Sequence, residues 1–324
     1  MNDYSIAAAL AVMLLCAGAL PSWSQEAETA VTPEGCRTEK FAVPSACMKR
    51  NIRSWVVLPP AYLKEEDGRF PVLICLHGRS APYTTWSEMS RLRACLASMP
   101  MILAGFDGDI ASQYVDSPIN PSSQFQTFIF DEFIPFIHAR YRTDGRQAIT
   151  GFSMGGFGAL YSMLSKPQAF VSVSGLSSSL PTLEGKADPT EFVRRFSGVL
   201  GSYEEHRQAY EAADVCALLR ARAAEGVRLP PMMLRCGTRD RLLPETRAFV
   251  DCTAGLNAAL WKRIEAEIGG PDSREKQALV RQRYEKERIE LLSVESDGAH
   301  DWTYWHSQSP AVAEFHWKWF SAQR

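Results

Sequence analysis

The sequence has no excess of charge of either sign. Its 324 residues include 35 basic and 37 acidic side chains, which gives a formal net charge of −2. Proteins that bind nucleic acid or anionic membranes usually present a strongly basic field, so we predict no nucleic-acid partner. Hydrophobic residues make up 46% of the chain and charged residues 22%. These values exclude a disordered or coiled-coil chain and predict a large core.

Metal-ligand patterns, internal repeats and breaks in composition are also absent. No two cysteines are separated by two residues, and no cysteine lies in a cluster with histidine. Structural zinc sites use such patterns, so we predict no metal. No feature points to an organic cofactor, and the expectation is that none is needed. The length fits one large α/β domain, since such domains often run to about 250 residues.

Long hydrophobic runs are rare, and the one at residues 6–20 is too short to cross a bilayer, which needs roughly 20 residues. We predict that residues 1–24 form a signal peptide cut ahead of Gln25, and that the mature chain is secreted or periplasmic. The alternative is an uncleaved anchor, and the absence of Lys and Arg from residues 1–5 is unusual for a signal peptide. No later segment has the composition of a membrane span.

The chain has eight cysteines. Cys16 lies in the predicted signal peptide, which leaves seven, so at least one thiol is free or pairs between chains. In an oxidising compartment we favour a disulfide between Cys36 and Cys47, which flank a short stretch near the N-terminus. A pairing of Cys216 with Cys252 is a second, weaker hypothesis.

Strand and helix patterns alternate after residues 25–44, a polar stretch that we predict to be a linker. Residues 125–141 repeat apolar side chains every three to four positions, which is typical of an amphipathic helix, although Pro135 lies within it. The predicted strands are 53–58, 71–76, 101–106, 147–150, 170–174, 231–236 and 289–294. Strands separated by helices favour a mostly parallel sheet covered on both faces. We predict a single α/β domain over residues 45–324.

The sequence Gly151-Phe152-Ser153-Met154-Gly155 follows a predicted strand and opens a predicted helix. This context is typical of the nucleophile elbow, in which a sharp turn holds a serine above the carboxyl end of a sheet. The alternative is a glycine-rich turn with a capping serine. We predict that Ser153 is a nucleophile.

A serine nucleophile needs a base, and that base needs an orienting acid. Of the six histidines, His300 is the best candidate because it lies in a loop after a predicted strand, while His306 is a nearby competitor. Asp240 also follows a predicted strand and is the candidate acid. Asp297 is the runner-up, since it lies too near His300 on the same loop to orient the ring easily.

Negative charge on a tetrahedral intermediate needs backbone donors. We predict that the N–H groups of Met154 and Arg79 supply them, since these residues follow the nucleophile and the early strand 71–76 respectively. His77, just before Arg79, is expected to be a structural loop residue rather than a base.

Several motifs occur together in one order: LHG at 76–78, YVDSP at 114–118, GFSMGGFGAL at 151–160, CGTRD at 236–240 and AHDWTYW at 299–305. This set resembles the esterase D-like family of α/β-hydrolases over roughly residues 45–320. The resemblance implies an α/β-hydrolase fold, and it places the catalytic residues at Ser153, Asp240 and His300. The AHDWTYW segment looks most like the secreted carboxylesterase and feruloyl-esterase branch.

Two further features bear on the substrate. Residues 262–288 form a charged insertion where that family usually has a short link, and we expect a solvated helical hairpin rather than a lid or dimer contact. Trp302 and Trp305 follow the candidate base closely. They are predicted to bind the substrate, and the alternative is that they pack in the core.

The expected function is that of a secreted serine carboxylesterase that acts on a small-molecule or carbohydrate ester, with acyl or feruloyl groups on carbohydrate as one option. The alternatives are an acyltransferase that uses a sugar acceptor and an inactive binding protein with a hydrolase fold. The sequence leaves the oligomeric state open.

Overall fold

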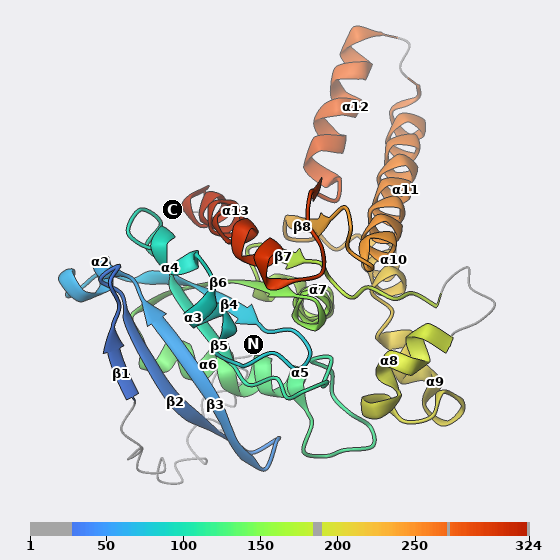
Figure 1. The fold of residues 1–324 in the computed structure, drawn as a ribbon. Coiled ribbons are helices and arrows are strands. Elements are labelled where there is room, and N and C mark those ends of the chain that lie inside the picture. The colour runs from blue at the N-terminus through green and yellow to red at the C-terminus, as the bar shows by residue number, and fades with distance from the viewer. Residues whose placement is uncertain (1–27, 184–189, 271–272, 323–324) are drawn as a thin grey trace, which may run out of the picture.

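The computed structural model describes residues 28–183, 190–270 and 273–322. The predicted signal peptide and Cys16 lie outside these residues. Nine strands form one sheet, in the order β1-β2-β3-β5-β4-β6-β7-β8-β9 (Figure 1). The strands are β1 (Glu28–Val31), β2 (Arg37–Ser45), β3 (Arg50–Leu58), β4 (Phe70–Leu76), β5 (Ile102–Phe106), β6 (Thr143–Phe152), β7 (Val173–Leu176), β8 (Met232–Gly237) and β9 (Leu291–Ser296).

The sheet has an antiparallel part and a parallel part. Strands β1, β2, β3 and β5 pair antiparallel, whereas β5, β4, β6, β7, β8 and β9 pair parallel. The prediction of a mostly parallel α/β sheet is therefore confirmed. Because the parallel strands end at the same edge, the loops that follow β4, β6, β8 and β9 come together there.

Strand β4 shows why the core forms on both faces of the sheet. All seven of its residues, FPVLICL, are buried. Val72, Ile74 and Leu76 join one hydrophobic cluster, and Leu73 and Cys75 join the other, as the alternation of a strand requires. An uninterrupted apolar run is thus the signature of a strand covered on two sides.

The helices cover both faces. They are α2 (Pro60–Lys64), α3 (Thr85–Met89), α4 (Leu92–Cys95), α5 (Phe125–Thr127), α6 (Ile134–Arg140), α7 (Met154–Ser165), α8 (Thr190–Leu200), α9 (Tyr203–Ala212), α10 (Val215–Ala224), α11 (Leu243–Ile268), α12 (Arg274–Glu287) and α13 (Trp302–Ala322), with a π-helical turn at Phe128–Phe133 and a 3₁₀ turn at Pro167–Ala169. Helix α7 packs in the first cluster and α13 in the second, on the opposite face.

The prediction that residues 25–44 form a linker is wrong for the described part of this stretch. Residues 28–31 and 37–45 form β1 and β2, which extend the sheet at its antiparallel edge. Only some positions of β2 are buried, among them Thr38 and Val43. Strand β2 lies between β1 and β3, but its faces are only partly covered. A strand with a solvated face needs no continuous apolar run, so its polar composition gave no sign of a strand.

The preferred disulfide is also wrong. Cys36 and Cys47 are both free thiols, and they lie beyond opposite ends of β2. Nine extended residues place those ends about 30 Å apart, whereas a disulfide needs Cα atoms about 6 Å apart. Cys216 and Cys252 are free as well, but they lie close together between α10 and α11, where Cys252 Sγ donates to the carbonyl oxygen of Cys216 at 3.9 Å.

The charged insertion forms an antiparallel pair of helices that projects from the body of the protein (Figure 1). Helix α11 continues to Ile268, and α12 returns along it. Trp261 and Tyr284 pack edge to face at 5.0 Å, and Arg283 pairs with Glu267 across the two helices. The expected helical hairpin is therefore what this stretch forms.

The described part of the chain contains neither a membrane-spanning helix nor a cluster of metal ligands. Within residues 28–183, 190–270 and 273–322, no helix has both the length and the apolar character that a bilayer crossing requires. In the same part of the chain, no group of three or more His, Cys, Asp or Glu side chains is arranged to hold a metal ion.

Candidate active site

Ser153 lies in a strained turn between β6 and α7. Its backbone has φ 54° and ψ −118°, a region that residues with a side chain rarely adopt. The N–H of Ser153 donates to the carbonyl of Leu176 at 2.9 Å, and its own carbonyl accepts from the N–H of Ser179 at 3.1 Å. The neighbouring strand β7 and the loop after it thus hold the turn in place.

Glycine is required on both sides of Ser153 because backbone segments approach closely there. A Cβ on Gly151 would lie 2.1 Å from the carbonyl oxygen of Gly155, on the first turn of α7. Gly155 faces the end of β4 at a similarly short distance. The two glycines let strand and helix meet tightly enough to expose the serine side chain, as in a nucleophile elbow.

Three side chains predicted from the sequence meet at the carboxyl edge of the sheet. The Nε2 atom of His300 lies 3.0 Å from Ser153 Oγ, and its Nδ1 lies 3.0 Å from both carboxylate oxygens of Asp240. A carboxylate only accepts, so Nδ1 carries the proton and Nε2 is free to accept from the serine hydroxyl. This is the hydrogen-bond order of a serine hydrolase triad.

The surroundings of Asp240 favour the ionised form of its carboxyl group. Burial works against its charge, but hydrogen bonds from His300 and from the N–H of Leu242 outweigh it and hold the pKa of this carboxyl below its usual value. The Asp240 side chain is fully covered. A buried, ionised carboxylate fixes the ring orientation and the tautomer of His300.

The rival candidates lie elsewhere. His306 is exposed, and its Nδ1 lies 2.7 Å from the carbonyl of Met89. Asp297 is an exposed partner of Arg239. Neither is hydrogen-bonded to Ser153 or His300 within the described part of the chain.

A cavity of about 100 Å³ opens beside Ser153. Met154 and Arg79, the two residues predicted to donate to an oxyanion, both line it. Met154 is the first residue of α7, so its N–H is not used by the helix and is free for an oxygen in the cavity.

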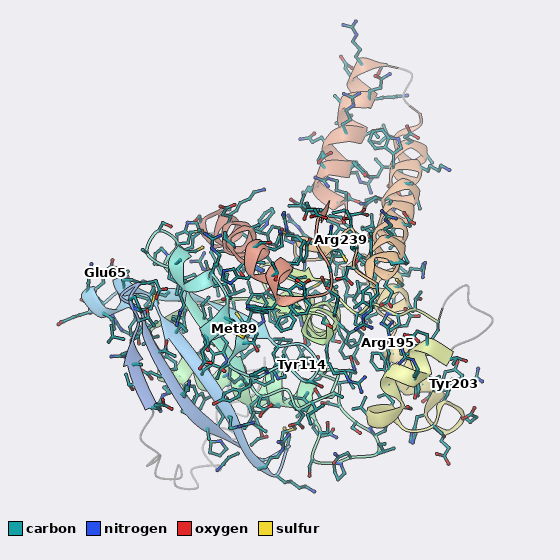
Figure 2. All side chains as sticks on the ribbon, in the orientation of Figure 1. Glu65, Met89, Tyr114, Arg195, Tyr203 and Arg239 are labelled. Carbon is teal, nitrogen blue, oxygen red and sulfur yellow. The ribbon has the colours of Figure 1, made fainter. Side chains whose placement is uncertain are left out.

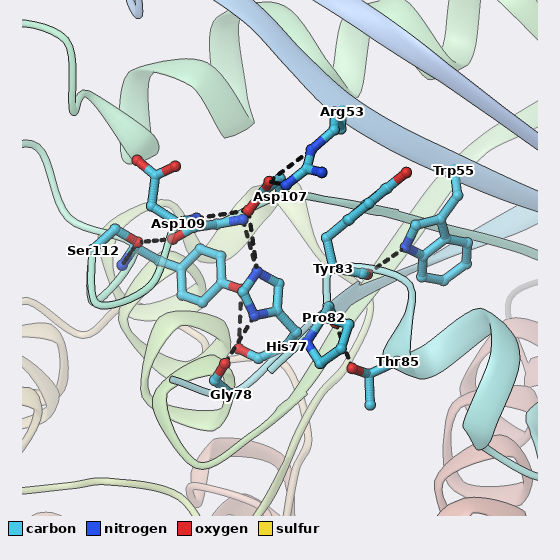
Figure 3. Close-up of polar contacts among 12 residues, drawn as sticks. Arg53, Trp55, His77, Gly78, Pro82, Tyr83, Thr85, Asp107, Asp109 and Ser112 are labelled. Carbon is cyan, nitrogen blue, oxygen red and sulfur yellow. Dashed lines mark hydrogen bonds and ion pairs between the residues drawn. The ribbon is translucent and has the colours of Figure 1, made fainter. Parts of the chain in front are cut away.

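The loop that carries Arg79 is fixed by His77, which is buried (Figure 3). The N–H of Gly108 donates to His77 Nε2 at 2.8 Å, so the proton is on Nδ1, which donates to the carbonyl of Gly78 at 2.8 Å. Burial lowers the pKa of His77, which favours this neutral form. The geometry agrees with a structural role for His77.

Trp302 and Trp305 lie at the start of α13, not in a loop. Both rings pack on Phe152, with centroids 5.5 and 4.5 Å away, and Trp305 also meets the His300 ring edge-on at 5.1 Å. Neither tryptophan lines the cavity at Ser153. Their contacts favour the packing alternative, and a role in substrate binding stays a prediction.

Sequence reasoning missed three arginines of this cavity, Arg194, Arg195 and Arg241. Arg241 follows Asp240 directly and could have been found from that position. Arg194 and Arg195 come from α8, and no local pattern there indicates that the helix reaches the nucleophile.

Comparison with known proteins agrees with this geometry. The family model described as "Putative esterase" matches residues 45–313. The chain belongs to this family. The family expected from the motifs is thereby confirmed. Among curated relatives, an acetyl esterase of Caldicellulosiruptor saccharolyticus is 22% identical over 279 residues, which is 81% of this chain and 91% of that protein. Esterase Rv1288 of Mycobacterium tuberculosis is 38% identical over 115 residues, which is 32% of this chain, and the match spans about a quarter (24%) of that protein.

Solved structures show the same fold. A ferulic acid esterase superposes with a TM-score of 0.66 at 21% identity, covering 88% of this chain and 98% of its own. An S-formylglutathione hydrolase from Agrobacterium tumefaciens also gives 0.66, at 20% identity, covering 90% and 99%. The predicted α/β-hydrolase fold is confirmed by these similarities and by the sheet topology.

Proposed function

We propose that this member of the family is a serine carboxylesterase that works through an acyl-enzyme. The observation that carries the proposal is the continuous hydrogen-bonded series from Ser153 through His300 to Asp240, with 3.0 Å at each contact. This arrangement turns a weak hydroxyl nucleophile into a reactive one.

In the first half of the reaction, Ser153 Oγ attacks the ester carbonyl carbon and His300 Nε2 takes the hydroxyl proton. Negative charge forms on the carbonyl oxygen, which the N–H groups of Met154 and Arg79 stabilise. The tetrahedral intermediate collapses, the bond to the alcohol breaks, and His300 returns the proton to the leaving alkoxide. The acyl group remains as an ester of Ser153.

In the second half, water enters and His300 takes one of its protons. The hydroxide attacks the acyl carbon, and the intermediate releases the carboxylic acid while His300 returns a proton to Ser153. Throughout both halves Asp240 stays ionised and stabilises the imidazolium that His300 forms. The lowered pKa of Asp240 supports this role.

A fluorophosphonate probe tests the proposal directly. We expect covalent labelling of the wild-type chain at Ser153 and none of Ser153→Ala, with ester hydrolysis reduced on the order of a thousandfold or more in the variant. Labelling at another residue, or a variant with a tenth of wild-type activity, would refute the assignment. Absence of any labelling would instead favour an inactive binding protein.

Export of the chain and the class of its substrate need separate tests. We propose export with removal of residues 1–24, supported by the apolar run at 6–20, and the mass of the mature chain checks it. Acyl or feruloyl groups on carbohydrate are the proposed substrates, supported by the AHDWTYW segment at 299–305. A panel of acetyl, butyryl and feruloyl esters and acetylated xylan, assayed with and without sugar acceptors, separates hydrolysis from acyl transfer.

A further inference from the structure

Four guanidinium groups surround the cavity at Ser153. Arg79, Arg194, Arg195 and Arg241 all line it, and among the described residues that line it none is acidic. An oxyanion hole built from backbone N–H groups does not require such a cluster. The cluster therefore calls for a separate explanation.

Two of the four arginines are neutralised by glutamates. Arg195 extends from α8 (Figure 2) and pairs with Glu245 at 2.6 Å and with Glu191 at 2.7 Å. Arg194 pairs with Glu191 at 2.8 Å. The Arg195 and Glu245 side chains are only 13% and 14% exposed, so this pair is a fixed part of the wall. Two carboxylates thus balance two guanidinium groups.

Arg79 and Arg241 differ from that pair. Both side chains are exposed, and within residues 28–183, 190–270 and 273–322 neither has an acidic partner. Arg79 comes from the loop after β4, and Arg241 follows Asp240 in the loop after β8. Because a guanidinium group stays protonated near neutral pH, the wall carries two uncompensated positive charges next to the nucleophile.

Carboxylates in a neighbouring, larger cavity do not cancel this excess of positive charge. Arg79, Arg194 and Arg195 also line a larger cavity of about 990 Å³ that contains Asp107 and Asp109. Asp107 pairs with Arg53 at 2.5 Å (Figure 3), and Asp109 pairs with Arg50 at 2.5 Å. Each of these two carboxylates is therefore already paired with an arginine other than Arg79 and Arg241.

Resting on the proposed esterase function, we propose that the substrate is an anionic ester, with its negative group held by Arg241 and Arg79 while its carbonyl lies at Ser153. Guanidinium groups bind carboxylates through two parallel N–H···O bonds, which would orient the ester as well as attract it. The anion belongs either to the acyl part or to the alcohol part of the ester, and one experiment separates the two.

The experiment compares two pairs of esters that differ in charge. For the acyl side, mono-4-nitrophenyl adipate is compared with its neutral methyl ester. For the alcohol side, 4-acetoxybenzoate is compared with methyl 4-acetoxybenzoate. In at least one pair we expect kcat/KM to favour the anion by about tenfold at low salt, and this preference should shrink as added NaCl screens the charges. The pair that shows it identifies the side.

Substitution of Arg241 tests the site itself. Arg241→Gln should reduce the preference for the anion about tenfold, Arg241→Lys should keep part of it, and Arg241→Glu should reverse it. Arg281→Gln, which removes an exposed arginine on α12 that lines neither cavity, is the matched control and should keep the wild-type preference.

The results that overturn the proposal are distinct from those that overturn the esterase function. Hydrolysis of all four esters with no preference for the anion, or a preference that Arg241→Gln leaves intact, refutes the anion site and leaves the esterase in place. No hydrolysis of any ester, together with no fluorophosphonate labelling, refutes the esterase function and this inference with it.

Discussion

Gly155 on α7 faces the carbonyl oxygen of Leu76 at the end of β4, at a distance that leaves no room for a side chain. A Cβ at position 155 would lie 2.2 Å from that oxygen. The contact joins the helix that begins after the nucleophile to the strand whose loop carries Arg79. Close packing at this position therefore fixes the spacing between the two predicted oxyanion donors.

We predict that Gly155→Ala destabilises the fold by about 1–3 kcal/mol, because the backbone of α7 must move away from β4. The same movement should reduce kcat more than it changes KM, since it widens the oxyanion site. Thermal melting and ester kinetics check both effects. Gly255→Ala on α11 is the control: its Cβ would meet nothing within 4 Å, so it should be neutral or stabilise by up to about 1 kcal/mol. Equal behaviour of the two variants would contradict the argument.

His300 is expected to be the base, and His306 is not. His300→Gln removes the proton acceptor, and we expect kcat/KM to fall on the order of a thousandfold. His306→Gln loses only a hydrogen bond with the carbonyl of Met89 and should keep most of the activity. An inactive His306→Gln protein that remains folded would count against the assignment.

Asp240 and Asp297 allow a similar comparison. Asp240→Asn donates hydrogen bonds where the carboxylate accepted them, which favours the wrong tautomer of His300, so we expect a loss on the order of a thousandfold in kcat with little change in melting temperature. Asp297→Asn removes only an exposed pairing with Arg239 and should change kcat less than about twofold. Steady-state kinetics of both variants decides between the two acids.

His316 predicts how stability depends on pH. Its ring is buried, with Nδ1 lying 2.8 Å from Ser172 Oγ and Nε2 lying 2.8 Å from Ser174 Oγ. Burial lowers the pKa of His316 to about 3. An unfolded chain would bind a proton there below about pH 6.5, and the folded chain would not. The free energy of unfolding should therefore fall as the pH drops from about 6.5 toward 3, by about 1.4 kcal/mol per unit from this group.

Urea unfolding at pH 7.5 and at pH 5.0 measures that effect. His316→Gln should be less stable than wild type at pH 7.5, because it disturbs a buried network, yet it should lose about 2 kcal/mol less on acidification. His77, whose pKa burial also lowers, contributes in the same direction to both proteins. Parallel pH dependences in wild type and variant would contradict the prediction.

The contacts of Trp305 favour a packing role over the substrate-binding role predicted from the sequence. Its ring stacks on Phe152 behind His300, so Trp305→Ala should cost about 3 kcal/mol of stability and reduce activity on all esters alike. Trp305→Phe, which keeps a ring, should recover most of the loss. A changed ratio of activity on bulky and acetyl esters, with an unchanged melting temperature, would show instead that the residue binds substrate.

The parts of the molecule that sequence alone could predict are those with a local signature. The run at 71–76 indicated a strand covered on two faces, and the Gly-x-Ser-x-Gly context indicated the turn at Ser153. His300 and Asp240 could be chosen because each follows a strand of a parallel sheet, where the loops gather at one edge.

What sequence could not predict depends on contacts between distant segments. Strand β2 has a polar, half-solvated pattern that resembles a linker until its partner β3 is known. The arginines around Ser153 come from the loops after β4 and β8 and from α8, and only the fold brings these segments to one cavity. The proximity of Cys216 to Cys252 likewise follows from the packing of α10 on α11.

The projecting hairpin has a mechanical consequence. Helix α11 starts at Leu243, whose N–H bonds to the carbonyl of Asp240, and its 26 residues make a rod about 39 Å long. The near end of this rod is bonded to Asp240, which accepts a hydrogen bond from His300, and the far end reaches into solvent with α12 (Figure 1). A partner that displaced the tip of the hairpin would therefore move the first turn of α11, which is three residues from the Asp240 carboxylate.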